Sequence, residues 1–270
     1  MFNRDIMLEE TRKALTMLNR DLYPECYERL LQAMTSGETP FPVVSDLMEC
    51  DKPKQLPPFL LEYITTLYQA EIEMENDHAM CNLGAHYYAG NRGFEQNFKK
   101  AMELYTMAAE RGNRQAQENL GYCYYYGRDG KVDYEKAFHY FALRAFDGWP
   151  TSLYKIGDMY LHGYYVQKDE REAFALYRRC LELVDSDERD VVSGPVHLRL
   201  GNMYLNGIGT QKNPEQALLH YNLAELMLFQ MIRNGDYMYK NSLREAIEGE
   251  SKARTLLMEN LPGDEWTFDD

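Results

Sequence analysis

The stretch Ala116-Gln-Glu-Asn-Leu120-Gly121-Tyr-Cys-Tyr124-Tyr-Tyr-Gly127 decides the fold, because its pattern occurs four times in the chain. Each copy has Leu or Ile followed by Gly, a Tyr three residues after that Gly, and a second Gly three residues later. Ten or eleven residues beyond stands an Ala, with an aromatic residue four positions after it. The pattern recurs after 37, 36 and then 44 residues. Recurrence of a pattern at intervals of about this length indicates a repeat architecture. The copies begin at Leu83, Leu120, Ile156 and Leu200.

The spacing within one copy predicts two helices joined by a turn. Leu120 and Tyr124 are four residues apart, so they share one face of a helix. Gly121 between them allows a neighbouring helix to approach closely, and Gly127 suits the left-handed residue that ends a helix. A polar residue then precedes the second helix of each unit, where a side-chain oxygen can cap the free backbone amides. These predicted N-caps are Asn97, Asp133, Asp169 and Asn213.

The pattern resembles the Sel1-like repeat family, which is related to the tetratricopeptide repeat. The resemblance is carried by Ala116–Gly127, Asp133–Tyr140 and Asn206–Ala217, and it covers about residues 77–230. It implies an all-α fold, a right-handed α-α superhelix of about four helix-turn-helix repeats with helical caps. Such repeats share a binding architecture but no common chemistry.

The repeats divide the chain into three parts. Residues 1–76 are expected to form an N-terminal helical cap with a degenerate repeat at its end, and residues 234–270 a C-terminal capping helix with an acidic tail. Within the third unit, the segment 184–195 is acidic and rich in turn residues, which predicts a projecting loop. The four repeats are predicted at 77–112, 113–148, 149–195 and 196–233.

Charge and cysteine content narrow the classes of partner and compartment. The formal net charge is −14, which disfavours binding to nucleic acid or to an anionic membrane and favours a neutral or basic protein or peptide. The five cysteines are widely spaced, with no CxxC pair. The first ten residues do not resemble a signal peptide, and no apolar run reaches about 18 residues. We therefore expect free thiols and a cytoplasmic location.

A binding groove is predicted on the first helix of each unit. The face opposite the packed Leu and Tyr should line the concave side of the array. Tyrosine is common on this face in the second unit, and tyrosines are enriched at binding hot spots. The alternative is that these tyrosines only fill the packing between units. The predicted groove residues are His78, Cys81, Tyr88, Glu118, Tyr122, Tyr125, Tyr126, Tyr154, Asp158, His162, Asn202 and Asn206.

The sequence favours a non-catalytic scaffold for protein–protein interaction, such as an adaptor or an immunity-type inhibitor of a basic toxin. The alternative is a hydrolase-like enzyme with a Cys/His or carboxylate site in the groove. His78 and Cys81 share a helix face, but two ligands alone do not make a zinc site. The Gly-x-Gly turns follow helices and lack the Lys-Ser/Thr of a phosphate-binding loop. We predict no catalytic residue, metal or cofactor, and the oligomeric state stays open.

Overall fold

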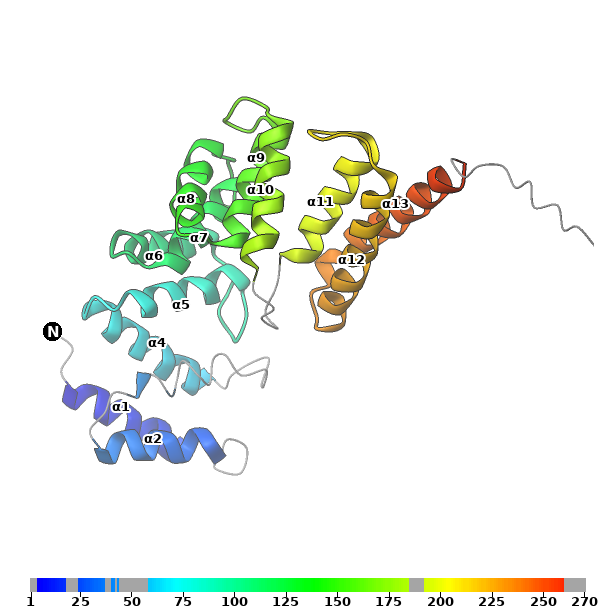
Figure 1. Ribbon diagram of the computed structural model, residues 1–270. Helices are drawn as coiled ribbons and strands as arrows, with labels where there is room; N and C mark the ends of the chain where they lie inside the picture. The colour runs from blue at the N-terminus through cyan, green and yellow to red at the C-terminus, as the bar shows by residue number, and fades with distance from the viewer. Residues whose placement is uncertain are drawn as a thin grey trace, which may run out of the picture. The chain divides into compact units, whose positions relative to one another are not determined.

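The computed structural model describes residues 4–17, 24–36, 40, 41, 43, 58–184 and 192–259, and no strand occurs in these ranges (Figure 1). The predicted all-α fold is confirmed. The chain divides into two compact units, residues 1–133 and 134–270, which are described separately.

The helices of each unit follow one another as antiparallel pairs. The first unit contains α1 (Arg4–Met17), α2 (Pro24–Ser36), α4 (Pro58–Glu73), α5 (Asp77–Ala89), α6 (Phe98–Glu110) and α7 (Arg114–Tyr125). The second unit contains α8 (Tyr134–Phe146), α9 (Pro150–His162), α10 (Glu170–Leu183), α11 (Ser193–Asn206), α12 (Pro214–Arg233), a short 3-10 turn (Tyr237–Tyr239) and α13 (Lys240–Glu259).

An aromatic ring from the second helix of a repeat packs directly on the glycine inside the first helix. A Cβ added to Gly157 would lie 2.7 Å from the ring of Tyr177, which is fully buried. Because real Cβ atoms almost never come so close, only glycine permits this packing distance. The predicted close approach of the two helices is confirmed. The same contact joins Gly84 to Tyr105 and Gly201 to Tyr221.

Three of the four predicted N-caps are confirmed. The side chains of Asn97, Asp169 and Asn213 accept hydrogen bonds from backbone amides in the first turns of α6, α10 and α12. In the third repeat, Tyr165 adopts a left-handed φ of 65°, where Gly209 of the fourth repeat has 66°. Left-handed single residues end the first helix at Gly90, Gly163 and Gly207.

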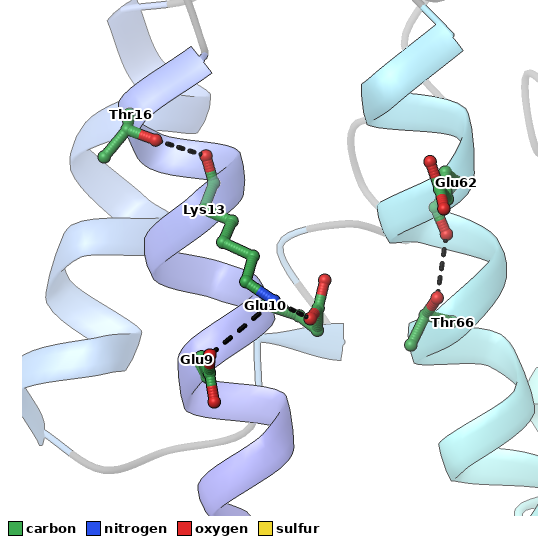
Figure 2. Close-up of polar contacts among 6 residues, drawn as sticks. All are labelled: Glu9, Glu10, Lys13, Thr16, Glu62 and Thr66. Carbon is green, nitrogen blue, oxygen red and sulfur yellow. Dashed lines mark hydrogen bonds and ion pairs between the residues drawn. The ribbon is translucent and has the colours of Figure 1, made fainter.

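Buried contacts join the N-terminal helices α1 and α4. Figure 2 shows Lys13 paired with Glu10 at 2.6 Å and Glu9 at 3.6 Å, all on α1. The Thr66 hydroxyl likewise bonds within α4, to the carbonyl of Glu62. The link between α1 and α4 is instead the buried hydrogen bond between the hydroxyls of Thr11 and Tyr63, at 2.9 Å, within a shared apolar core.

The C-terminal end of the array is covered by α13, which packs on both α11 and α12. Its buried Ala246 and Ala253 allow close contact. The predicted loop at 184–195 requires one correction: Ser193, Gly194 and Pro195 already belong to the first turn of α11, where a proline costs no hydrogen bond. Residues 185–191 and the acidic tail at 260–270 lie outside the described residues.

Candidate functional site

The first unit carries an exposed arginine held among aromatic rings. Arg128 follows the C-terminal end of α7, and its guanidinium lies 5.5 Å from the ring centre of Tyr88, 5.2 Å from Phe98 and 5.4 Å from Tyr126. Its Nε donates a hydrogen bond to the Tyr88 hydroxyl at 3.0 Å. These distances fall within the range of cation–π attraction, so the rings orient the guanidinium while leaving it accessible.

Two further tyrosines extend this surface. The rings of Tyr122 and Tyr126 are parallel with centres 6.3 Å apart, and Tyr125 meets Tyr126 edge-on at 5.0 Å. The stacking follows from the helix, since residues four positions apart lie above one another. Tyr126, at the end of α7, is 48% exposed, and Tyr122 and Tyr125 are half-buried. We call the set Tyr88, Phe98, Tyr122, Tyr125, Tyr126 and Arg128 the Arg128 cluster.

The Arg128 cluster unites four of the predicted groove residues, Tyr88, Tyr122, Tyr125 and Tyr126. Sequence reasoning missed Arg128 and Phe98, because it followed only the first helices, whereas Arg128 lies in a turn and Phe98 begins a second helix. The cluster combines aromatic rings, tyrosine hydroxyls and the Arg128 guanidinium. These groups can together make apolar contacts, hydrogen bonds and ion pairs with another protein. Tyrosine and arginine are also the residue types enriched at interface hot spots.

Three predicted groove residues are buried, which corrects the expectation that they face a groove. Cys81 and Glu118 are each 4% exposed, and Asp158 is 3% exposed. Burial, followed by the nearby carboxylate of Asp77, raises the pKa of the Cys81 thiol to about 12. The reason for the misassignment is geometric: α5 packs on α4 and α6, α7 packs on α6, and α9 packs on α8 and α10, so faces other than the Leu and Tyr stripe are also covered.

Asp158 lies at the centre of a buried polar network in the second unit. Its Oδ1 accepts hydrogen bonds from the Tyr177 hydroxyl at 2.7 Å and from Nε of Arg199 at 3.0 Å. The Lys155 ammonium lies 3.7 Å from Oδ2. Tyr154 is half-buried beside them, with its ring centre 4.8 Å from the Lys155 ammonium. A carboxylate engaged by two cations is a structural group rather than a general base.

The other predicted groove residues are exposed or half-buried. Asn202 accepts the Tyr221 hydroxyl at 2.7 Å and donates to a carboxylate oxygen of Glu245 at 2.8 Å. Asn206 is exposed and donates to the carbonyl of Asn202 at 2.9 Å. His162 is exposed, with its ring 5.2 Å from that of Tyr164, and His78 is exposed at the start of α5.

A histidine pair between α11 and α12 escaped the sequence reasoning. The Nδ1 atoms of His197 and His220 are 2.8 Å apart, so one ring donates to the other. Burial and the neighbouring His197 lower the pKa of His220 to about 4. The two residues are 23 positions apart, so no local spacing reveals the pair. Among the described residues, no group of three or more His, Cys, Asp or Glu side chains could hold a metal ion.

Comparison with known families places the repeat pattern among Sel1 repeats. The family model of the Sel1 repeat matches residues 77–113, 114–143, 150–182 and 196–227. These four matches agree with the four helix pairs from α5 to α12. Over the part of the chain that the structure describes, no helix has the length and apolar character needed to cross a membrane.

Individual relatives match parts of the chain. The ERAD-associated E3 ubiquitin-protein ligase component HRD3B of Arabidopsis thaliana is 39% identical over 108 residues, which are 39% of this chain but only 16% of that protein. The crystal structure of a Sel1 repeat protein from Oxalobacter formigenes has a TM-score of 0.51 and 25% identity, over 71% of this chain and 78% of that one. A protective antigen of uropathogenic Escherichia coli with an SLR fold has a TM-score of 0.58 and 19% identity, over 94% and 54%.

Proposed function

Because the chain belongs to the Sel1 repeat family, we propose that it is a non-catalytic scaffold that holds a protein or peptide partner in a tyrosine-rich groove, with the Arg128 cluster as its main contact. Sel1 repeat proteins are generally protein-interaction scaffolds and bind protein partners.

The Arg128 cluster is the observation that carries this proposal. Its guanidinium is positioned by three rings and by the Tyr88 hydroxyl, so little rotamer freedom is lost when a partner binds. Exposed Tyr126 can cover an apolar side chain while Arg128 bonds a backbone carbonyl or a carboxylate. The other exposed or half-buried predicted residues, His78, Tyr154, His162, Asn202 and Asn206, are proposed as further contacts.

Thiol chemistry gives no support to the alternative hydrolase. Cys81, Cys123 and Cys180 are buried, and burial raises the pKa of both Cys81 and Cys123 to about 12. A catalytic cysteine needs the opposite shift, because only the thiolate attacks a carbonyl. Free thiols are also what a reducing compartment preserves, which supports the proposed cytoplasmic location.

The net charge of −14 supports a neutral or basic partner, since long-range attraction speeds the capture of a basic protein. Two forms of the scaffold follow: an adaptor, or an immunity-type inhibitor that covers a basic toxin. Nucleic acid and membrane surfaces carry the wrong charge for either form.

The test has two stages. The full chain is used as bait in its native cell, and each recovered protein is then purified and its affinity measured directly. The triple change Tyr122→Ala, Tyr125→Ala and Tyr126→Ala, and separately Arg128→Ala, should each weaken binding of the true partner. Tyr237→Ala is the matched control, because this tyrosine is 64% exposed and lies outside the cluster. Unchanged affinity in both cluster variants would show that the partner binds elsewhere.

A further inference from the structure

The face of α12 that points away from α11 and α13 carries large apolar side chains. Leu219 is 49% exposed, Leu226 is 55% exposed and Phe229 is 56% exposed. Since an α-helix turns about 100° per residue, all three lie at least about 120° around the helix from the centre of its buried stripe. The buried stripe, on the side of α12 that packs on α11 and α13 (Figure 1), consists of Ala217, Tyr221, Ala224, Leu228 and Met231.

These apolar residues belong to a longer line of exposed side chains on the same face. Starting at Glu215 and ending at Arg233, its members follow one another at steps of four, three, four, three and four residues. Such alternating steps are those of the a and d positions of a heptad, along which two helices pack side by side. We call this line the α12 seam: Glu215, Leu219, Asn222, Leu226, Phe229 and Arg233.

The α12 seam has the same spacing in both directions, so it fits a second copy of itself. A two-fold axis beside Ala224 would place Leu219 opposite Phe229 of the second copy. The same axis would place Asn222 opposite Leu226, and one polar residue in such a seam sets the register at some cost in stability. Two-fold dimers are the commonest oligomers, and they require one surface patch that matches itself.

The charges at the two ends of the seam favour an antiparallel pair. Glu215 and Arg233 are 18 positions apart, which is about 27 Å of helix, so they cannot pair with each other within one chain. In an antiparallel pair, Glu215 of each copy lies opposite Arg233 of the other, with one ion pair at each end. A parallel pair would place like charges together at both ends. Exposed ion pairs of this kind set orientation more than affinity.

We propose that the chain forms a two-fold dimer through the α12 seam, with the two copies of α12 antiparallel. Burial of Leu219, Leu226 and Phe229 supplies the affinity, and the charged ends fix the orientation. One helix from each copy makes a contact at the small end of specific interfaces, which bury about 1,200 Å² or more, so we expect a dissociation constant of about 10 μM. The inference goes beyond the proposed function, because the partner proposed there binds the Arg128 cluster in the first unit and either contact can form without the other.

Sedimentation velocity of the full chain tests the dimer. The measurement uses about 0.15 M salt, because the net charge of −14 on each copy opposes self-association and salt at this concentration screens charges beyond about 8 Å. From about 1 to 200 μM protein, the weight-average mass should rise from that of one chain toward that of two.

One substitution in the seam and one outside it separate this surface from a general effect of added charge. Leu226→Glu places a carboxylate in the centre of the seam and should raise the dissociation constant about fiftyfold or more. Leu143→Glu is the matched control, because it makes the same change on α8 of the second unit, at a leucine that is 44% exposed. The control should dimerise like the parent chain. Both side chains are exposed, so both variants should keep the circular dichroism of the parent.

Charge reversal at the ends of the seam tests the orientation. Glu215→Arg leaves arginine at both ends, and Arg233→Glu leaves glutamate at both ends, so each variant alone should dimerise several-fold more weakly than the parent. The double variant again carries one charge of each sign and should recover the affinity of the parent. A double variant as weak as the single ones would overturn the antiparallel arrangement.

Two results would overturn the dimer itself. The first is a parent chain that keeps the mass of a single chain up to about 200 μM, which would leave the α12 seam to a different protein. The second is an equal dissociation constant for Leu226→Glu and Leu143→Glu, which would place the contact between copies on another surface.

Discussion

Tyr177 donates its hydroxyl to Asp158 at 2.7 Å, from the second helix of the third repeat to the first. Tyr177 packs on Gly157, and its hydroxyl donates to the next residue, Asp158. The fourth repeat uses the same arrangement, with Tyr221 and Asn202 at 2.7 Å. The amide in the fourth repeat shows that this hydrogen bond needs only an acceptor, whereas the charge of Asp158 serves Arg199 and Lys155.

Removing the Asp158 carboxylate should therefore be costly. Asp158→Ala leaves Arg199 and the Tyr177 hydroxyl without their acceptor in a buried site, and breaking a buried pair in this way costs about 3–5 kcal/mol. Asp158→Asn keeps an oxygen for Tyr177 and should cost less. Urea unfolding of the two variants measures both losses, with Asn202→Asp as the companion in the fourth repeat. Equal losses for Ala and Asn would contradict the distinct role of the charge.

Gly157→Ala should destabilise the third repeat through steric overlap. The added methyl would lie 2.7 Å from the Tyr177 ring, and overpacking of a core costs about 1–3 kcal/mol. Reducing the ring in the double variant Gly157→Ala, Tyr177→Leu should recover part of that loss, so the two changes should not be additive. Thermal unfolding of the single and double variants gives the coupling energy, and strict additivity would rule out the contact as its source.

The His197–His220 pair should make stability depend on pH. The pKa of His220 falls from an ordinary 6.5 to about 4 in the folded chain, so the unfolded chain binds the proton more readily. Neutral His220 therefore makes its full contribution to the free energy of unfolding above about pH 6.5, and this contribution declines as the pH falls toward 4. Because His220 is partly exposed, we expect the free energy of unfolding to fall by about 1 kcal/mol, which is less than the full pKa shift of His220 would give.

Carboxylates also titrate toward the acidic end of this range, so the histidine effect must be isolated as a difference. Urea unfolding at pH 7.5 and pH 5 is compared between the parent chain and His220→Gln, which cannot be protonated. The variant should lose less stability over this interval. An identical pH dependence in both proteins would exclude the histidine pair as its cause.

Buried thiols should react only when the chain unfolds. Cys81 and Cys123 are at most 4% exposed, and the high pKa of each thiol keeps the reactive thiolate scarce at neutral pH. Cys180 donates to the carbonyl of Pro150 at 3.1 Å and is also buried. A thiol reagent should label these three cysteines slowly in the native chain, and about five thiols in guanidinium under non-reducing conditions. Rapid native labelling of Cys81 or Cys123 would contradict the observed burial.

Within the second repeat, stability and binding should respond to different tyrosines. Tyr124 is half-buried rather than fully buried, so Tyr124→Ala should cost somewhat less than the roughly 3–5 kcal/mol of a fully buried aromatic. Each hot-spot residue of the Arg128 cluster should contribute about 2 kcal/mol to partner binding, or roughly thirtyfold in affinity. Arg128→Lys should fall near Arg128→Ala, because a lysine lacks the planar fork that the rings hold. Full affinity in the lysine variant would show that charge alone matters there.

Helical periodicity in the sequence predicted the paired helices of the repeats, three of their N-caps and the close approach of a neighbouring helix at the repeat glycine. Each of these depends on residues within one repeat, where helical periodicity states which side chains share a face, as for Leu120 and Tyr124. The repeated spacing presents this local signal four times, and in the fourth repeat the predicted N-cap Asn213 directly precedes the first residue of α12.

The accessibility of the other side chains depends on tertiary packing. Helical periodicity describes a single helix. The burial of Cys81, Glu118 and Asp158 depends instead on the neighbouring helices that cover each of these side chains. Arg128 lies in a turn, which has no period, and the His197–His220 contact joins two helices at a distance that no spacing encodes. Local helix geometry follows from the residues of one segment. Contacts between helices depend on how side chains of different segments pack together, and this packing arises only in the folded chain.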